Sequence, residues 1–476
     1  MDGENVDLIC IGAGFAGLTA ALRARQLGLS VLVLERQSDA KQYNNSRITT
    51  GVFHVASNDV RLPPEKLIEA INIETQNYAK PDLVRAIAQN AARVVDWLKD
   101  QGVTLEHETR MAYVAGRAHL VLTPARAMRA GLDWHGKGGD RTLGVLEDKL
   151  VNLGGRILRG VEVAKLVMAE GVCVGVDARP QSHKDGGQML RFGAKAVVVA
   201  DGGFQANLAM LKDTVTPEPS RVKVRATPSG TGDGIRMARD AGARITEVGA
   251  FYGHIQSIEA MHDDRLWPYP NIDIAATASI LVDGSGKRFV DEGRGAVFIT
   301  NAIAKLPDPL SASVVLSRKI WDEVATQGVS PPNPEMTKNG GALIEGPDLA
   351  TIARAIGVPG NELAATIANY NAALKSAALD RLTPIRTEKK AKAHLIEAPY
   401  CAIKVCAGVT NTMGGIDIDA DAHVLADDGT AIPGLYAAGS TTGGLEGGPN
   451  VGYVGGIVKA FVLGLCAGEA AARDLK

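Results

Sequence analysis

The sequence contains few aromatic residues, few cysteines and no excess of either charge. Aromatic residues make up only 4% of the 476, and the formal net charge is −2, with no basic block. A chain with this balance lacks the electrostatic footprint for nucleic acid or for an anionic membrane surface, so we expect neither as a partner. The five cysteines are scattered, with no Cys-x-x-Cys pair and no metal-ligand spacing: Cys10, Cys173, Cys401, Cys406 and Cys466. This usage predicts reduced core thiols in a cytoplasmic protein and no metal site.

Long hydrophobic runs are absent as well. The most apolar stretch, residues 455–468, is too short to span a membrane and contains Lys459. The first seven residues, MDGENVD, are acidic and lead directly into an apolar strand, so we expect no signal peptide and no membrane insertion. The chain is rich in glycine instead, with 54 residues, and it is long enough for two or three domains. Abundant glycine is typical of nucleotide folds, where the backbone approaches its ligand closely.

A complete strand–helix–strand unit with a glycine-rich turn occupies residues 8–35. An apolar run at 8–11 leads into GAGFAG at 12–17, a helical pattern follows, and a second apolar run ends at Glu35. In this GxGxxG spacing Gly12 allows the tight turn, Gly14 lets the backbone approach a pyrophosphate, and Gly17 lets the helix pack on the strand. The N–H groups at the start of the helix then face the phosphates. The unit therefore predicts a dinucleotide site.

The acid at the end of the second strand and the number of fingerprints narrow the choice of dinucleotide. The Glu35 carboxylate can accept hydrogen bonds from both hydroxyls of an adenosine ribose, and it would repel a 2′-phosphate. The chain has no second GxGxxG, and glycine-rich nucleotide segments return at 434–439 and 443–456. A single fingerprint whose domain resumes near the C-terminus suggests one ligand bound along its length. We therefore expect FAD rather than a dissociating nicotinamide cofactor.

The middle of the chain differs in composition from both ends. From about residue 243 to about 390 aromatic residues and prolines become more frequent, and an Asp-Gly turn at 283–284 predicts a hairpin. We interpret this segment as an insertion. The expected fold is α/β, with a Rossmann-like FAD-binding domain formed by residues 1–242 and 391–476 and an α+β capping domain for the substrate at 243–390.

Motifs in a fixed order cover nearly the whole chain. They are IGAGFAGLTAA and LVLE, then VVVADGGF, GTGDGIRMARDAGA and GKRFVDEG, and finally NTMGGIDID and IPGLYAAGSTTGG. In this order they resemble the fumarate reductase/succinate dehydrogenase flavoprotein superfamily, which includes the 3-ketosteroid dehydrogenases. The resemblance implies an FAD domain and a capping domain with the substrate held between them. It also implies hydride transfer between flavin N5 and a carbon β to a carbonyl or carboxylate, while a protein group handles the α proton.

The remaining cofactor contacts are expected on polar and glycine-rich segments along the chain. Succinate dehydrogenases attach FAD to a His in the segment after the ribose acid, where this chain has Asn44-Asn45-Ser46, so we expect non-covalent FAD. An ordinary polar loop is the alternative for residues 43–51. Besides the residues named above, the expected FAD contacts are Phe15, Ala16, Arg36, Asn45, Ser46, Thr50, Gly51, Val163, Ala200, Asp201, Gly202, Gly232, Asp233, Asn411, Gly415, Gly439, Ser440 and Gly456.

The departures from the family pattern concern its cationic substrate clamps. Asn411 stands where the fumarate reductases have a carboxylate-binding His, and Arg294 is near the place of their proton-donating Arg but out of register. The final glycine segment, 445–453, contains no Arg. A dicarboxylate would leave its charges unpaired in such a site, so we expect it to be a poor substrate. Tyr453 stands there instead, as in the ketosteroid dehydrogenases, whose Tyr hydrogen-bonds a ketone oxygen.

The candidates for the acid/base are Tyr252, His254 and Tyr113. A second phenol, acting as a tyrosinate, could remove the α proton from a polarised ketone. A packed or surface role is the alternative for Tyr252 and His254. We therefore hypothesise the α,β-desaturation of a cyclic ketone. The alternatives are reduction of an enoate with Arg294 recruited to the site, and a flavin-binding subunit without turnover. The expected partners are the small-molecule substrate, ketone or enoate, and an electron acceptor such as oxygen, a quinone or a carrier protein.

Overall fold

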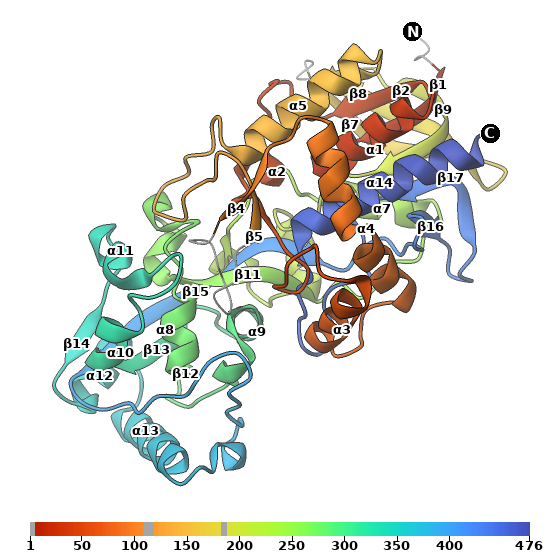
Figure 1. Ribbon diagram of the computed structural model, residues 1–476. Coiled ribbons are helices and arrows are strands. Elements are labelled where there is room, and N and C mark those ends of the chain that lie inside the picture. The colour runs from red at the N-terminus through yellow and green to blue at the C-terminus, as the bar shows by residue number, and fades with distance from the viewer. Residues whose placement is uncertain (1–4, 109–118, 182–187) are drawn as a thin grey trace.

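The computed structural model describes residues 5–108, 119–181 and 188–476 (Figure 1). Figure 1 shows two lobes, one containing both ends of the chain and the other containing the helices of the central segment. The first lobe is built on an eight-stranded sheet and the second on a six-stranded sheet. The expected α/β class with a Rossmann-like domain is confirmed by this arrangement and by the parallel pairing described next.

The sheet of the first lobe is parallel where the dinucleotide fingerprint lies. Its strand order is β16-β17-β9-β1-β2-β6, and β1 pairs in parallel with β2 on one side and β9 on the other. These strands are nearly continuous apolar runs because both faces of a parallel sheet are covered. The strands are β1 (Asn5–Ile11), β2 (Val31–Glu35), β6 (Arg156–Arg159), β9 (Leu190–Val199), β16 (His423–Leu425) and β17 (Ala431–Ala437), with the hairpin β7 (Val161–Ala169) and β8 (Val172–Pro180) attached through β9.

Two helices from opposite ends of the chain pack together on this sheet. They are α1 (Phe15–Gln26) and α14 (Gly456–Asp474). A Cβ on Gly464 would lie 2.6 Å from the Ala16 carbonyl oxygen, and a Cβ on Gly468 would lie 2.6 Å from that of Ala20. Glycine at this one-turn spacing therefore allows the two backbones to approach closely, so the C-terminal segment is fixed against the fingerprint helix.

The second sheet is organised around one long strand. Strand β15 (Tyr400–Met413) pairs with β10 (Lys223–Val224), β11 (Ala250–Ser257), β13 (Ser313–Ser317) and β14 (Ile344–Gly346), and β12 (Ile280–Val282) pairs with β13. Strands β10 and β15 lie outside the predicted capping segment 243–390, and the domain boundaries stay a prediction. Strand β15 ends at Asn411-Thr412-Met413, so these residues lie where the second sheet meets the first lobe.

The other elements cover the sheets and connect them. A small sheet joins β3 (Val52–Phe53), β5 (His119–Leu122) and β4 (Leu105–Glu108). The remaining helices are α2 (Asn45–Ile48), α3 (Pro64–Thr75), α4 (Pro81–Asp100), α5 (Gly138–Asn152), α6 (Leu208–Thr214), α7 (Asp233–Asp240), α8 (Asp273–Ala278), α9 (Ala296–Ala304), α10 (Arg318–Glu323), α11 (Pro332–Lys338), α12 (Leu349–Ile356) and α13 (Gly360–Lys375). All five cysteines are buried and free. Within the described ranges, none of the helices has both the length and the apolar character needed to cross a bilayer.

Candidate active site

The glycine-rich turn between β1 and α1 has no room for side chains. A Cβ on Gly12, whose φ is +97°, would lie 2.7 Å from the Ala200 carbonyl oxygen, and a Cβ on Gly17 would lie 2.0 Å from the Gly12 carbonyl oxygen. A Cβ on Gly14 would lie 3.2 Å from Ser46 Oγ. The three glycines thus leave the backbone exposed to a ligand and hold the helix against the strand, as their spacing predicts.

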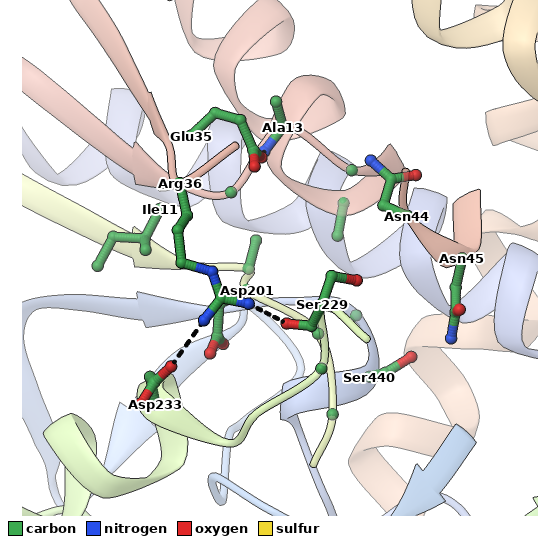
Figure 2. Close-up of a pocket in the computed structure, with 18 of the residues that line it drawn as sticks. Ile11, Ala13, Glu35, Arg36, Asn44, Asn45, Asp201, Ser229, Asp233 and Ser440 are labelled. Carbon is green, nitrogen blue, oxygen red and sulfur yellow. Dashed lines mark hydrogen bonds and ion pairs between the residues drawn. The ribbon is translucent and has the colours of Figure 1, made fainter. Parts of the chain in front are cut away.

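The Glu35 carboxylate closes the far side of this turn. It is buried, and it accepts hydrogen bonds from the backbone N–H of Ala13 at 2.9 Å and of Gln37 at 2.9 Å. Beside it, Arg36 extends across the cleft and donates to the Ser229 carbonyl at 2.8 Å and to Asp233 at 3.3 Å (Figure 2). The carboxylate is therefore held in place at the end of β2, where a ribose would meet it.

A cleft with about 1010 Å³ of space runs from this turn toward β15. Most expected cofactor residues line it: Gly12, Gly14, Phe15, Ala16, Glu35, Arg36, Asn45, Ser46, Val163, Ala200, Asp201, Gly202, Asp233, Asn411, Gly439 and Ser440. Others are not among its lining residues: Gly17, Thr50, Gly51, Gly232, Gly415 and Gly456. The lining also includes residues that we did not expect, among them Gln37, Gln205, Ser229, Met237 and Ala460, and no local motif marks these.

The chemistry of this lining fits FAD. Gly203 and Gly230 lie against the side chain of Gln205, whose buried Oε1 has no partner within the described chain. Burial raises the pKa of Asp201 to about 6, and its Oδ2 accepts the N–H of Gly234. A glycine cradle, a ribose-binding acid and amide or acid groups that can pair with a polar ring are the features that this cofactor needs. These residues would hold FAD along the cleft from Glu35 to Asn411.

Two phenols stack beyond the end of this cleft. The rings of Tyr252, on β11, and Tyr453 lie 3.8 Å apart between centroids, at an interplanar angle of 15°. The Tyr453 hydroxyl accepts a hydrogen bond of 2.8 Å from the N–H of Gly456. Gly456 is the first residue of α14. Chain topology therefore brings together two expected residues that are 201 positions apart in sequence.

Tyr252 is hydrogen-bonded to a histidine and, through it, to an acid. Its hydroxyl lies 2.9 Å from His254 Nε2, and His254 Nδ1 lies 2.5 Å from Asp273 Oδ2. The other oxygen of Asp273 accepts the N–H of Ile255 at 3.0 Å, which fixes the carboxylate. These partners assign the proton of a neutral His254 to Nδ1, so that Nε2 accepts the Tyr252 proton. No motif in the sequence indicates Asp273, which is 19 residues beyond His254.

Burial decides the protonation states of this cluster. It raises the pKa of both Tyr252 and Tyr453 above the ordinary value, so both phenols keep their protons at neutral pH. Burial also lowers the pKa of His254, and it outweighs the opposing effect of Asp273. Burial therefore disfavours the tyrosinate base that we expected, and a neutral phenol can act instead by passing its proton on to His254.

A buried guanidinium lies beside the same cluster. Arg225 follows β10, is 5% exposed, and places its guanidinium carbon 4.9 Å from the centre of the Tyr269 ring. Arg126 approaches the same ring, at 5.9 Å. The expected loss of positive charge concerned the family's clamp positions and stays a prediction, and these two guanidinium groups add positive charge near the phenols. The two arginines do not stand at the family's motif positions, and only the tertiary pairing of β10 with β15 brings Arg225 here.

The remaining candidates take no part in the hydrogen bonds of this cluster or lie outside the described residues. Arg294 donates to the Pro449 carbonyl at 2.7 Å and to Asn450 Oδ1 at 2.9 Å, and it lies 3.5 Å over the Phe298 ring. These contacts hold it on the final glycine segment rather than on Tyr252. Tyr113 lies outside the described residues. Asn411 lines the cleft, where its Oδ1 accepts from Asn45 Nδ2 at 3.0 Å.

Comparison with known proteins agrees with this geometry. Residues 7–452 match the family described as "FAD binding domain". The chain is 29% identical over 404 residues to the NADH:acrylate oxidoreductase of Vibrio harveyi, covering 83% of this chain and 37% of the relative. It is 26% identical over 484 residues to the NADH:fumarate oxidoreductase of Klebsiella pneumoniae, covering 99% of this chain and 48% of the relative. The chain thus spans less than half of the length of these relatives.

A solved structure supports the fold over the whole chain. The 3-ketosteroid Δ1-dehydrogenase of Sterolibacterium denitrificans aligns with a TM-score of 0.74 at 20% identity, covering 98% of this chain and 99% of that one. Together with the fumarate oxidoreductase, it confirms the resemblance that the ordered motifs indicated.

Proposed function

We propose that this chain, which belongs to the FAD binding domain family, is an FAD-dependent oxidoreductase that acts on the carbon–carbon bond next to a carbonyl group. When bound, FAD supplies two-electron chemistry at that bond. The chain itself must then polarise the carbonyl and move the proton of the α carbon. The observation that carries the proposal is the stack of Tyr252 on Tyr453, with the Tyr252 hydroxyl joined to His254 and Asp273.

Tyr453 is suited to hold the carbonyl oxygen. Its hydroxyl accepts the Gly456 N–H, and within the described chain no acceptor takes its own proton. Because burial raises its pKa, this proton stays on the phenol and can be donated to a ketone oxygen. Such a hydrogen bond stabilises enolate character and makes the neighbouring carbon more acidic.

Tyr252 is suited to move the α proton. As it takes this proton, its own proton passes to His254 Nε2, and the imidazolium that forms is stabilised by Asp273. In the opposite direction, the same relay delivers a proton to the α carbon. We propose desaturation of a cyclic ketone as the reaction, because two neutral phenols suit a neutral carbonyl.

Reduction of an enoate is the second candidate. It is favoured by the buried guanidinium of Arg225 beside the relay, and by the relatives named for acrylate and fumarate. The relay serves this reaction equally, with Tyr252 as the proton donor. Since the chain spans less than half of those relatives, the electron donor or acceptor of the whole protein is part of this proposal.

Anaerobic stopped-flow spectroscopy of the flavin tests the proposal. We expect cyclic ketones to bleach the oxidised flavin, and enoates to restore the colour of flavin that dithionite has reduced. Tyr252→Phe and Tyr453→Phe should each slow the productive direction by about 10²-fold or more. Tyr436→Phe is the matched control, because its hydroxyl donates to Asp474 at 2.8 Å, at the end of α14. Unchanged flavin kinetics in both site variants would refute the assignment.

A further inference from the structure

The side chain of Arg225 crosses the second sheet toward the proton relay. Arg225 donates its backbone N–H to Val409 on β15, and its Cδ lies 3.2 Å from where a Cβ on Gly408 would be. The same Cβ would lie 2.9 Å from the carbonyl oxygen of His254. Gly408 therefore leaves the space through which the arginine passes over β15 toward the strand that carries His254.

The guanidinium is only partly satisfied by the protein. Its Nε donates to the Pro268 carbonyl at 2.9 Å and its Nη1 to Thr410 Oγ1 at 3.0 Å. Its Nη2 is buried and has no hydrogen-bond partner among the described residues. Both partners are neutral, so a full positive charge is held at 5% exposure without an ion pair in the described chain. A buried cation in this state is costly unless an anion joins it.

The carboxylate of the relay, Asp273, does not supply that anion. Asp273 is occupied by His254 Nδ1 and by the N–H of Ile255, and it makes no ion pair with Arg225. Lys223, two residues before Arg225, does have an acidic partner. Its Nζ lies 3.0 Å from Asp264 Oδ1. Lys223 is thus paired with a carboxylate, whereas Arg225 makes no ion pair within the described residues and keeps a buried Nη2 without a partner.

We propose that Arg225 binds a carboxylate of the substrate, so that the substrate class is carbonyl compounds that carry this anion. This assignment rests on the proposed function for the identity of the reacting bond. A planar guanidinium offers N–H donors in a fixed fork, which suits the two oxygens of a carboxylate. With Tyr453 stacked on Tyr252, and Arg225 beside Tyr269 and the strand that carries His254, the anion and the polarised oxygen bind to different groups of the chain. A substrate held at both points is oriented relative to the relay.

Binding to the oxidised holoenzyme separates this assignment from the reaction itself. The probes are cinnamate and crotonate, each with its methyl ester, titrated anaerobically against the flavin absorbance. Oxidised flavin cannot reduce cinnamate, so its binding is measured whether or not the proposed reaction occurs. We expect each acid to bind wild type more tightly than its ester. In Arg225→Met the acids should lose about 10- to 100-fold in affinity, with little change for the esters.

Two further variants control for charge and folding. Arg225→Lys keeps the charge without the fork and should recover only part of the affinity. Lys223→Met removes the neighbouring paired cation and should leave carboxylate binding unchanged. The assignment is overturned if the acids bind no more tightly than the esters, or bind Arg225→Met as well as wild type. It is also overturned if the substitution alters the flavin spectrum or potential without altering acid affinity. Failure of every ketone and enoate to react, with these affinities intact, would refute only the proposed function.

Discussion

Glu446 and Lys459 form a buried ion pair beneath the segment that carries Tyr453. Their charged atoms lie 3.3 Å apart, with side-chain exposures of 5% and 2%. Glu446 Oε1 also accepts the N–H groups of Val454 and Gly455, at 3.0 and 3.1 Å, and Lys459 donates to the Thr442 carbonyl. The pair therefore fixes the turn between Tyr453 and the first residue of α14.

Breaking this pair from one side should destabilise the protein. Glu446→Gln leaves Lys459 buried and unpaired, and we expect a loss of about 3–5 kcal/mol, seen as a lower melting temperature of the holoenzyme. Lys459→Met should cost a similar amount, and the double variant should recover part of it. Additive effects in this double-mutant cycle would contradict a direct pairing.

Gly17→Ala should weaken FAD binding. The added Cβ would lie 2.0 Å from the Gly12 carbonyl oxygen, so the turn must move away from the geometry that faces the cofactor. We expect at least about a tenfold loss of affinity, measured by fluorescence titration of the apoprotein with FAD. Gly144→Ala in α5 is the control, because its Cβ would meet nothing within 4 Å. Equal affinities in the two variants would argue against this cradle.

The FAD of the purified protein should be released by acid. The segment after Glu35 contains Asn44-Asn45-Ser46 in place of a linking His, and Asn44 Oδ1 accepts the Arg47 N–H to begin α2. After precipitation with trichloroacetic acid, we expect the yellow colour in the supernatant. Colour that stays with the pellet would show a covalent link.

The proton relay predicts a pH profile. Burial lowers the pKa of His254, so His254 is neutral above its ordinary pKa, and ketone-driven flavin reduction should be independent of pH there and fall only in acid. Asp273 raises this pKa, so Asp273→Asn should shift the acid limb to lower pH and slow reduction by about 10²-fold or more. Asp264→Asn is the control, because Asp264 pairs with Lys223. It should change neither the position of the acid limb nor the rate of flavin reduction. An acid limb that does not move in Asp273→Asn would remove this carboxylate from the relay.

His423 gives the stability a separate pH dependence. It lies between Asp419 at 2.9 Å and Asp474 at 2.7 Å, and the hydrogen bond to Asp419 is the main reason that its pKa rises to about 9. Because the folded pKa exceeds the unfolded value of about 6.5, this stabilisation is complete below that value and is lost as pH rises through about 9. Melting temperatures between pH 6 and 10 should show this decline, and it should be smaller in His423→Gln. The exposed His107→Gln is the control and should retain the full decline.

The sequence predicted the elements that depend on local pattern and missed those that depend on pairing between distant strands. The turn at Gly12 and the acid at Glu35 are parts of one contiguous unit, so their spacing was sufficient. Arg225 lies in a segment without a motif, and it reaches the site only because β10 pairs with β15. Asp273 reaches His254 because α8 begins beside β11, which no spacing rule indicates. The sequence therefore did not indicate the charge of Arg225, whereas Tyr453 was proposed from the family motif and its role stays a prediction.

Strand β15 connects the two lobes mechanically. It pairs with β13 and β14 near Cys401 and ends beside the cofactor cleft at Asn411, so a single extended backbone belongs to both lobes. Beyond it, the chain turns at Gly414 and Gly415, where a Cβ would lie 1.7 Å from the Glu247 carbonyl oxygen and 2.2 Å from that of Thr441. Because β15 belongs to both lobes, a rotation of one lobe against the other would also move or deform this strand. Such a rotation would therefore displace Asn411, which lines the cleft, or bend β15.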